Sequence, residues 1–431
     1  MHRKAIYKFH FISGFLVVLP IIMYRGISIG FILLAVIDII TILKSKKMNN
    51  DILFISLFVL SVLTTVILFL NNMTASWKYG GLVNFLLFAV IIFFKTQMYN
   101  IYRKVTINSL IVGIRWGLLL QLIWGYLQFF LSVLFRFDLN RFIFTDTLHI
   151  IDRASRISVV GIVNVSGLGW HPAQLVPIVI LLYLMFDNTV IKFLTIGMAG
   201  LSSNSTCQLA ILLCLIYDLS KMIKRNKKDY VDRRQLLIRI GGIVVIIAIS
   251  LLNANIIDIA SGSINKLFSR LGMVINNDVS DLSTSFHLRY YTYLPSILRK
   301  SSWINILFGY GYDCSGYPYT LFLNQYSKLR SWSVETDYVN FVLGRGIIWT
   351  FVFYYWIIRC LRLGKKINKK YTFFFFNLLV CGVLYNVQFV YVIFIECVMD
   401  YCIRNKMDFF ADAKKGNKLS VTESEKKHNN R

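Results

Sequence analysis

The chain is a series of apolar stretches separated by short basic or polar segments. A membrane-spanning helix needs about 20 predominantly apolar residues, and the stretches approach that length. Because lipid offers no partners for backbone hydrogen bonds, we expect each stretch to be a helix. The pattern predicts about twelve helices, at residues 9–24, 26–43, 52–70, 81–94, 107–132, 172–186, 190–201, 205–221, 239–256, 335–358, 371–384 and 387–402.

Composition agrees with this pattern. Of the 431 residues, 56% are hydrophobic and only 16% are charged, and the mean hydropathy is +0.60. A soluble globular domain has about a quarter of its residues charged. The sequence therefore predicts an all-α, polytopic integral membrane protein.

The distribution of basic residues predicts the orientation. Residues 190–221 and 371–402 could each be one long helix, and either merger would reverse the topology downstream. With twelve spans and a cytoplasmic N-terminus, the cytoplasmic segments hold 32 of the 47 Lys and Arg residues, as the positive-inside rule requires. We therefore expect both termini in the cytoplasm. The net charge of +26 reflects this orientation, and its dispersal over many loops argues against a nucleic-acid partner.

Two connections are much longer than the others. They cover residues 133–171 and 257–334, and both are expected outside the cytoplasm. Loops longer than about 12 to 15 residues are usually functional or disordered. The second loop is rich in Trp and Tyr, which favours an ordered structure that either stacks on sugar rings or forms an interfacial aromatic belt. Residues 403–431 are polar and are expected to form a disordered cytoplasmic tail after a transmembrane domain at 1–402.

Cysteine and histidine show no pattern that indicates a cofactor. The seven cysteines predict no disulfide framework, because only Cys314 falls in a long outer segment. The six histidines lack metal-ligand spacing. We expect neither a metal site nor another cofactor.

The first long loop contains candidate anion-binding residues. Arg153 and Arg156 precede Gly167 and His171, just before the next span. A guanidinium pairs bidentately with phosphate, and glycine lets backbone approach a bulky ligand. The alternative is that these arginines contact lipid headgroups.

The second long loop repeats this combination. His287, Arg289 and Arg299 lie upstream of a turn that contains Gly309 and Gly311. The same two interpretations apply, a phosphate ligand or a headgroup contact.

Charged residues are also predicted within or beside the membrane. Glu335 and Asp337 lie at the outer mouth of a span, and Asn340 shares a helical face with Asp337. Arg115 lies within the fifth span and must face protein or water, either to contact a phosphate or to pair with a carboxylate such as Asp38.

Four segments together resemble the bacterial O-antigen polymerases of the Wzy type and their relatives, the O-antigen ligases. The resemblance covers residues 150–350 by motif and the whole chain by topology. Arg156 to Gly167 matches an Arg-x10-Gly loop motif. The other matching segments are Leu201 to Ser205, Arg289 to Gly309, and Glu335 to Gly346.

The resemblance implies a GT-C-like fold in the bacterial inner membrane and a metal-independent glycosyltransferase. Such an enzyme polymerises undecaprenyl-diphosphate-linked repeat units into O-antigen or capsule, with a chain-length regulator protein as partner. Arginine would stabilise charge on the leaving diphosphate, and a base would deprotonate or align the acceptor hydroxyl. On this hypothesis Arg156 and Arg289 hold the diphosphate, with Arg299 and Arg153 as further candidates. Glu335 or Asp337 is the base, with His171 and His287 as alternatives, and Arg115, Asn340, Gly167, Gly309 and Gly311 line the cavity.

Two other functions remain open at this point. The ligases place a histidine where this chain has Glu335, ten residues before a comparable glycine, which weakens the ligase interpretation. A lipid-linked oligosaccharide flippase or transporter also has about twelve spans, but discontinuous midplane helices and internal repeats are more typical of transporters.

Overall fold

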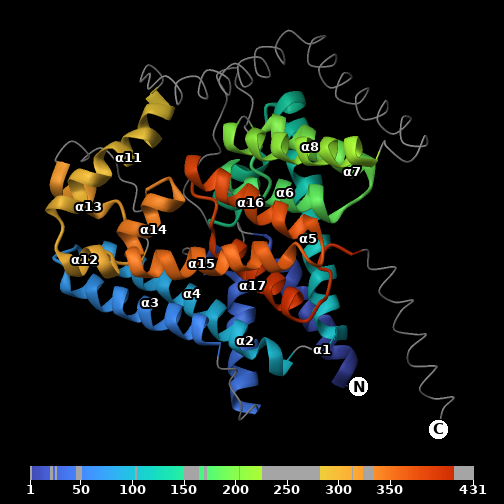
Figure 1. The fold of residues 1–431 in the computed structure, drawn as a ribbon. Helices are drawn as coiled ribbons and strands as arrows, with labels where there is room; N and C mark the ends of the chain where they lie inside the picture. The colour runs from blue at the N-terminus through green and yellow to red at the C-terminus, as the bar shows by residue number, and fades with distance from the viewer. Residues whose placement is uncertain are drawn as a thin grey trace.

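The computed structural model describes residues 2–19, 23–24, 27–44, 51–101, 104–149, 165–168, 172–202, 204–225, 282–312, 314–323 and 334–411. These residues are almost entirely helical (Figure 1). The exception among them is an antiparallel pair of two-residue strands, β1 (Met23–Tyr24) and β2 (Ile27–Ser28). The described helices are α1 (His2–Val17), α2 (Ile29–Lys44), α3 (Ile52–Leu70), α4 (Ala75–Ile101), α5 (Lys104–Phe135), α6 (Leu175–Met185), α7 (Thr189–Leu201), α8 (Ser205–Arg225), α11 (Leu282–Lys300), α12 (Trp303–Phe308), α13 (Tyr317–Leu323), α14 (Asp337–Arg345), α15 (Ile347–Gly364), α16 (Lys369–Leu384) and α17 (Val390–Arg404), with short π and 3-10 segments at Arg141–Thr147 and Pro172–Gln174.

Most apolar stretches are helices at their expected positions. The stretch at 52–70 coincides with α3. The two doubtful stretches, 190–221 and 371–402, are each divided into two helices, α7 and α8 in the first and α16 and α17 in the second. The stretch at 239–256 lies outside the described residues.

Two expected spans were wrong in their extent. The stretch at 335–358 is two helices, because α14 ends at Arg345 and α15 begins at Ile347 after Gly346, which has a φ of 86°. The stretch at 9–24 is not one helix, because α1 ends at Val17 and β1 follows. A hydropathy average gives the length of an apolar stretch. It does not detect a turn of the backbone inside that stretch.

Packing supports a membrane environment for the helices. Within the described residues, four helices are long and apolar enough to cross a bilayer, in α3, α4, α5 and α15. Their outer faces expose large apolar side chains, including Val66, Ile123 and Phe351. Contact with lipid is favourable for such apolar faces, whereas contact with water is not. Twelve crossings and the GT-C-like arrangement remain predictions.

The most buried helices lie inside this apolar shell. Every residue of α6 is buried, and α17 is buried from Tyr391 to Ile403. α1 and α5 pack so closely that a Cβ on Gly14 would lie 2.2 Å from the Leu110 carbonyl oxygen. Small residues permit such close contact, which suits helix packing in lipid.

The bundle has two distinct ends along α3, α4 and α15 (Figure 1). One end holds α11 and the short helices α12 to α14, where α3 ends and α15 begins. We call this the α14 end. The other end holds the start of α3 and the ends of α15 and α17, and it carries the basic segment 359–370 that is expected in the cytoplasm. We call this the basic end.

The first part of the expected disordered tail is folded. Residues 403 and 404 belong to the last turn of α17, residues 405–411 follow it, and Phe409 and Phe410 are buried. The Phe409 amide donates to the Tyr371 hydroxyl at 2.7 Å. Composition predicted disorder here. Two buried aromatic side chains are enough to attach this otherwise polar segment to the bundle. Residues 412–431 lie outside the described residues.

Candidate functional site

The candidate site is the α14 end, where the second long loop meets α14. The turn at residues 309–311 attaches to the last turn of α14 through main-chain hydrogen bonds. The Tyr310 amide donates to the Leu343 carbonyl at 2.8 Å, and the Gly311 amide donates to the Gly344 carbonyl at 3.1 Å. Two of the last α14 carbonyls, which lack partners within their own helix, are thereby satisfied.

Glycine is required at this junction. Gly309 has a φ of 82°, and a Cβ there would lie 2.4 Å from the Gly344 carbonyl oxygen. Gly311 has a φ of 142°. The Thr64 hydroxyl of α3 donates to the Phe308 carbonyl at 2.7 Å, which attaches the same turn to the bundle.

A buried polar cluster lies beside this junction. The Ser315 hydroxyl donates to the Asn340 side-chain oxygen at 2.5 Å and accepts from the Val334 amide at 2.8 Å. The Asn340 side-chain nitrogen has no hydrogen-bond partner among the described residues. A buried donor of this kind costs free energy unless a ligand or water completes it. Asn340 therefore keeps a side-chain N–H donor that no described residue uses.

Asp337 has a different environment from the one expected of a catalytic base. Its side chain is 1% exposed at the start of α14. Its carboxylate accepts from the amides of Val387 at 3.1 Å and Gln388 at 3.2 Å. These bonds and the helix dipole both stabilise the negative charge. Asp337 therefore attaches the chain before α17 to α14, and Glu335, which is partly exposed, is the more accessible carboxylate.

Behind this contact lies a carboxylate that we did not single out from the sequence. The Gln388 side chain donates to Glu396 at 3.0 Å, and Glu396 is fully buried in α17. The only available signal was an acidic residue within a predicted span, which is costly in lipid unless it is paired or functional.

Helix α11 carries the arginine and histidine candidates of the second loop. It packs on α13 and α14. The Tyr319 hydroxyl of α13 donates to the Tyr290 carbonyl at 2.7 Å. Arg299 is exposed near the end of α11. His287 and Arg289 lie on the same helix, but their side chains are outside the described part of the structure.

Two phenols at this end, those of Tyr291 and Tyr310, have raised pKa values. Burial is the main cause that raises the pKa of Tyr291 to about 12, and the nearby Asp337 charge acts in the same direction. Burial also raises the pKa of Tyr310, against a lowering hydrogen bond to Ser301. These tyrosines are therefore hydrogen-bond donors here and do not supply the base.

Arg345, the last residue of α14, is a second functional candidate that we did not single out. It is 3% exposed, and its guanidinium lies 4.2 Å from the ring centroid of Tyr312, 4.3 Å from that of Phe341 and 4.5 Å from that of Trp349. Three aromatic faces stabilise a cation that would otherwise be costly at this depth. Its place among aromatic side chains could not be read from a linear sequence.

Gly167 belongs to a different cluster, on α5. It has a φ of 60°, and its carbonyl accepts from the Asn140 side chain at 2.9 Å. The Gln121 side-chain oxygen accepts from the Leu168 amide at 2.7 Å, and Gln128 accepts from the Ser166 amide at 3.1 Å. The first long loop therefore ends on a polar anchor in α5, separate from the α14 contacts.

Arg115 is buried, as expected, but not at the α14 end. Its guanidinium donates to the Ala411 carbonyl, beyond the end of α17. The two Asp38 carboxylate oxygens have no hydrogen-bond partner among the described residues, so the expected pair with Arg115 is not formed. The described contact of Arg115 is to a backbone carbonyl.

The structure thus brings together part of the expected site. Gly309, Gly311, Asp337 and Asn340 meet around α14, and Gly167 and Arg115 contact other elements. Arg153, Arg156 and His171 lie outside the described residues. Within the described residues, no group of three or more His, Cys, Asp or Glu side chains is arranged to hold a metal ion.

Comparison with protein-family models gives no match, and comparison with curated proteins gives none either.

Proposed function

We propose that this protein is a polymerase of lipid-linked glycans, of the O-antigen polymerase type, in the cytoplasmic membrane of a bacterium. It would transfer a growing glycan from one undecaprenyl diphosphate carrier to the terminal sugar of a second lipid-linked repeat unit. A membrane-embedded enzyme suits substrates that are themselves held in the bilayer.

One observation supports this proposal most directly. Two segments of the resemblance, Arg289 to Gly309 and Glu335 to Gly346, meet at the α14 end through α11, the turn at 309–311 and α14. They combine closely packed glycines, the partly exposed carboxylate of Glu335 and the side-chain amide of Asn340, whose N–H has no partner among the described residues. An acceptor hydroxyl needs a base and an orienting donor, and Glu335 and Asn340 would provide them.

The diphosphate would be held by arginine. Arg289 on α11, together with Arg156 and with Arg299 and Arg153 as further candidates, would stabilise the charge that develops on the leaving group. Asp337 would position α14 through its contacts to Val387 and Gln388.

A transporter of lipid-linked oligosaccharide is the second candidate, because one observation favours it. The break between α14 and α15 at Gly346 makes a discontinuous helix, a feature typical of transporter binding sites. A transporter mutant would lose surface glycan altogether. A polymerase mutant would retain single repeat units.

The test is complementation of a deletion strain with single variants, read as the glycan ladder on gels. We expect Arg289→Ala and Glu335→Gln to reduce long chains by about a hundredfold each, the low end of the loss for a catalytic group, and to leave one repeat unit attached. Loss of every glycan band, including the single unit, would instead indicate a ligase or transporter.

The matched control is Lys300→Ala. Lys300 is an exposed cation on α11, as is Arg299, but it is not among the diphosphate candidates. Its variant should give a normal ladder at equal membrane insertion. A normal ladder from well-inserted Arg289→Ala and Glu335→Gln would refute the assignment.

A further inference from the structure

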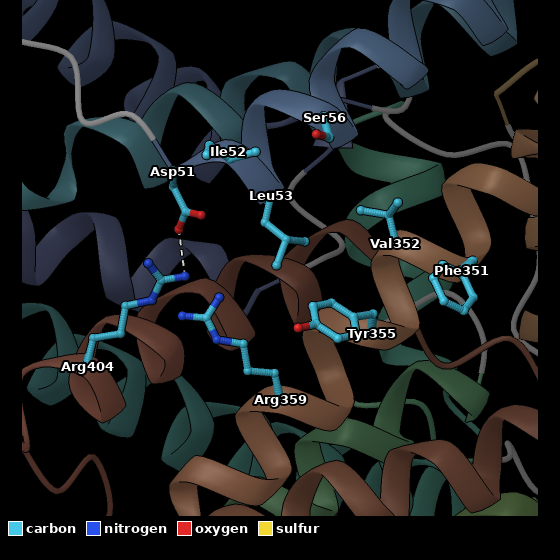
Figure 2. A pocket seen from close by; sticks show the side chains of 9 residues that line it. All are labelled: Asp51, Ile52, Leu53, Ser56, Phe351, Val352, Tyr355, Arg359 and Arg404. Carbon is cyan, nitrogen blue, oxygen red and sulfur yellow. Dashed lines mark ion pairs between the residues drawn. The ribbon is translucent and has the colours of Figure 1, made fainter.

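A cavity opens at the basic end of the bundle, far along α3 and α15 from the α14 end. It has a volume of about 510 Å3 and lies between the start of α3 and the ends of α15 and α17 (Figure 2). Its lining residues are Asp51, Ile52, Leu53, Ser56, Phe351, Val352, Tyr355, Arg359 and Arg404.

The cavity changes from polar to apolar along the helix axis. On α15, Arg359, Tyr355 and Phe351 are each four residues apart and therefore lie along one face. Arg359 is nearest the basic end, and Phe351 lies deeper. Phe351 and Tyr355 are 71% and 54% exposed, so the apolar part is open at its side. A ligand with one charged end and one apolar chain matches this gradient.

The polar end carries one positive charge in excess. Arg404 is neutralised, because it pairs with Asp51 at 2.6 Å and with Asp400 at 3.0 Å. Asp400 also pairs with the buried Lys95 at 2.5 Å. Arg359 makes no ion pair with any described residue, although its side chain reaches the same part of the cavity as the Arg404 side chain (Figure 2).

We propose that this cavity is a binding site for one anionic phospholipid. The phosphate binds the Arg359 guanidinium, with the Tyr355 hydroxyl as a second donor, and an acyl chain lies along Tyr355 and Phe351. A guanidinium matches phosphate geometry bidentately, and basic pockets between helices suit anionic headgroups. By the expected topology the lipid belongs to the cytoplasmic leaflet, on the side opposite the proposed glycan chemistry.

The test is native mass spectrometry of the purified protein with added phosphatidylglycerol or phosphatidylcholine of equal chain length. We expect wild type to retain phosphatidylglycerol in preference to phosphatidylcholine. Arg359→Ala should weaken that binding by about tenfold, the effect of losing one charge-assisted hydrogen bond. Arg359→Gln, which keeps most of the side-chain volume, should weaken it similarly.

The matched control is Arg362→Ala, which removes an exposed arginine from the same helix outside the cavity and should leave binding unchanged. Three results would overturn the proposal. They are equal retention of the two lipids by wild type, unchanged binding by both Arg359 variants, and displacement of the lipid by an equal concentration of inorganic phosphate, which would show that the apolar part contributes nothing.

Discussion

At the scale of single residues, the close contact between Gly309 and Gly344 governs the candidate site. The turn at 309–311 can bond to the last carbonyls of α14 only because no Cβ intervenes. The positive φ at Gly309 adds a backbone requirement to this steric one, since other residues rarely adopt it.

Gly309→Ala should therefore destabilise the α14 end. We expect a loss of about 1–3 kcal/mol from the strained backbone alone, with a lower apparent melting temperature in detergent. The control is Gly200→Ala, because a Cβ at Gly200 in α7 would meet nothing within 4 Å. Equal melting temperatures for the two variants would contradict the steric argument.

At the scale of elements, buried charges connect helices whose outer faces are apolar. Lys95 of α4 and Asp400 of α17 form an ion pair in which each side chain is 1% exposed. Lys95 also donates to the Cys397 carbonyl at 3.0 Å. Such a pair fixes which faces of two helices meet, because removing one partner of a buried ion pair is strongly destabilising.

Asp400→Leu should destabilise the protein by about 3–5 kcal/mol, because it removes the carboxylate that pairs with the buried Lys95. The double variant Lys95→Met with Asp400→Leu should recover much of that loss, and thermal unfolding in one detergent would measure both. Asp187→Asn is the control, since Asp187 pairs with Lys370 but is 65% exposed, and such pairs contribute about 0–1 kcal/mol. A double variant no more stable than Asp400→Leu would contradict the pairing argument.

At the scale of the whole molecule, the two ends of the bundle differ in chemistry. By the expected topology they also face opposite sides of the membrane. The α14 end holds the carboxylate, amide and glycine contacts of the proposed transfer site. The basic end holds Lys and Arg residues and the cavity with Arg359. Both proposals depend on these ends facing opposite sides of the membrane.

Cysteine labelling tests this orientation. All seven native cysteines are buried, so an impermeant maleimide should give a low background. Lys300→Cys at the α14 end should react from outside the membrane, and Lys366→Cys at the basic end should react only after the cytoplasmic face is opened. Reaction in the opposite order would refute the polymerase proposal, because the glycan acceptor would be on the wrong side.

The amino-acid sequence by itself determined the features that depend on local apolar length and charge. Lipid makes helix formation obligatory, so α3 could be predicted from hydropathy. The separation of α16 from α17 was predicted from the distribution of basic residues. The sequence also predicts that Asp337 and Asn340 share one helical face at the mouth of an expected span, with the 309–311 turn in the long loop before it.

Only the tertiary structure decided which polar groups meet. The break at Gly346, the ring contacts of Arg345 and the engagement of Asp337 by the Val387 amide all join residues through backbone reversals or neighbouring helices. Hydropathy averages over about 20 residues and does not register a single residue with positive φ. It also carries no information on helix rotation, and rotation determines whether a buried charge faces lipid, an aromatic ring or a partner of opposite charge.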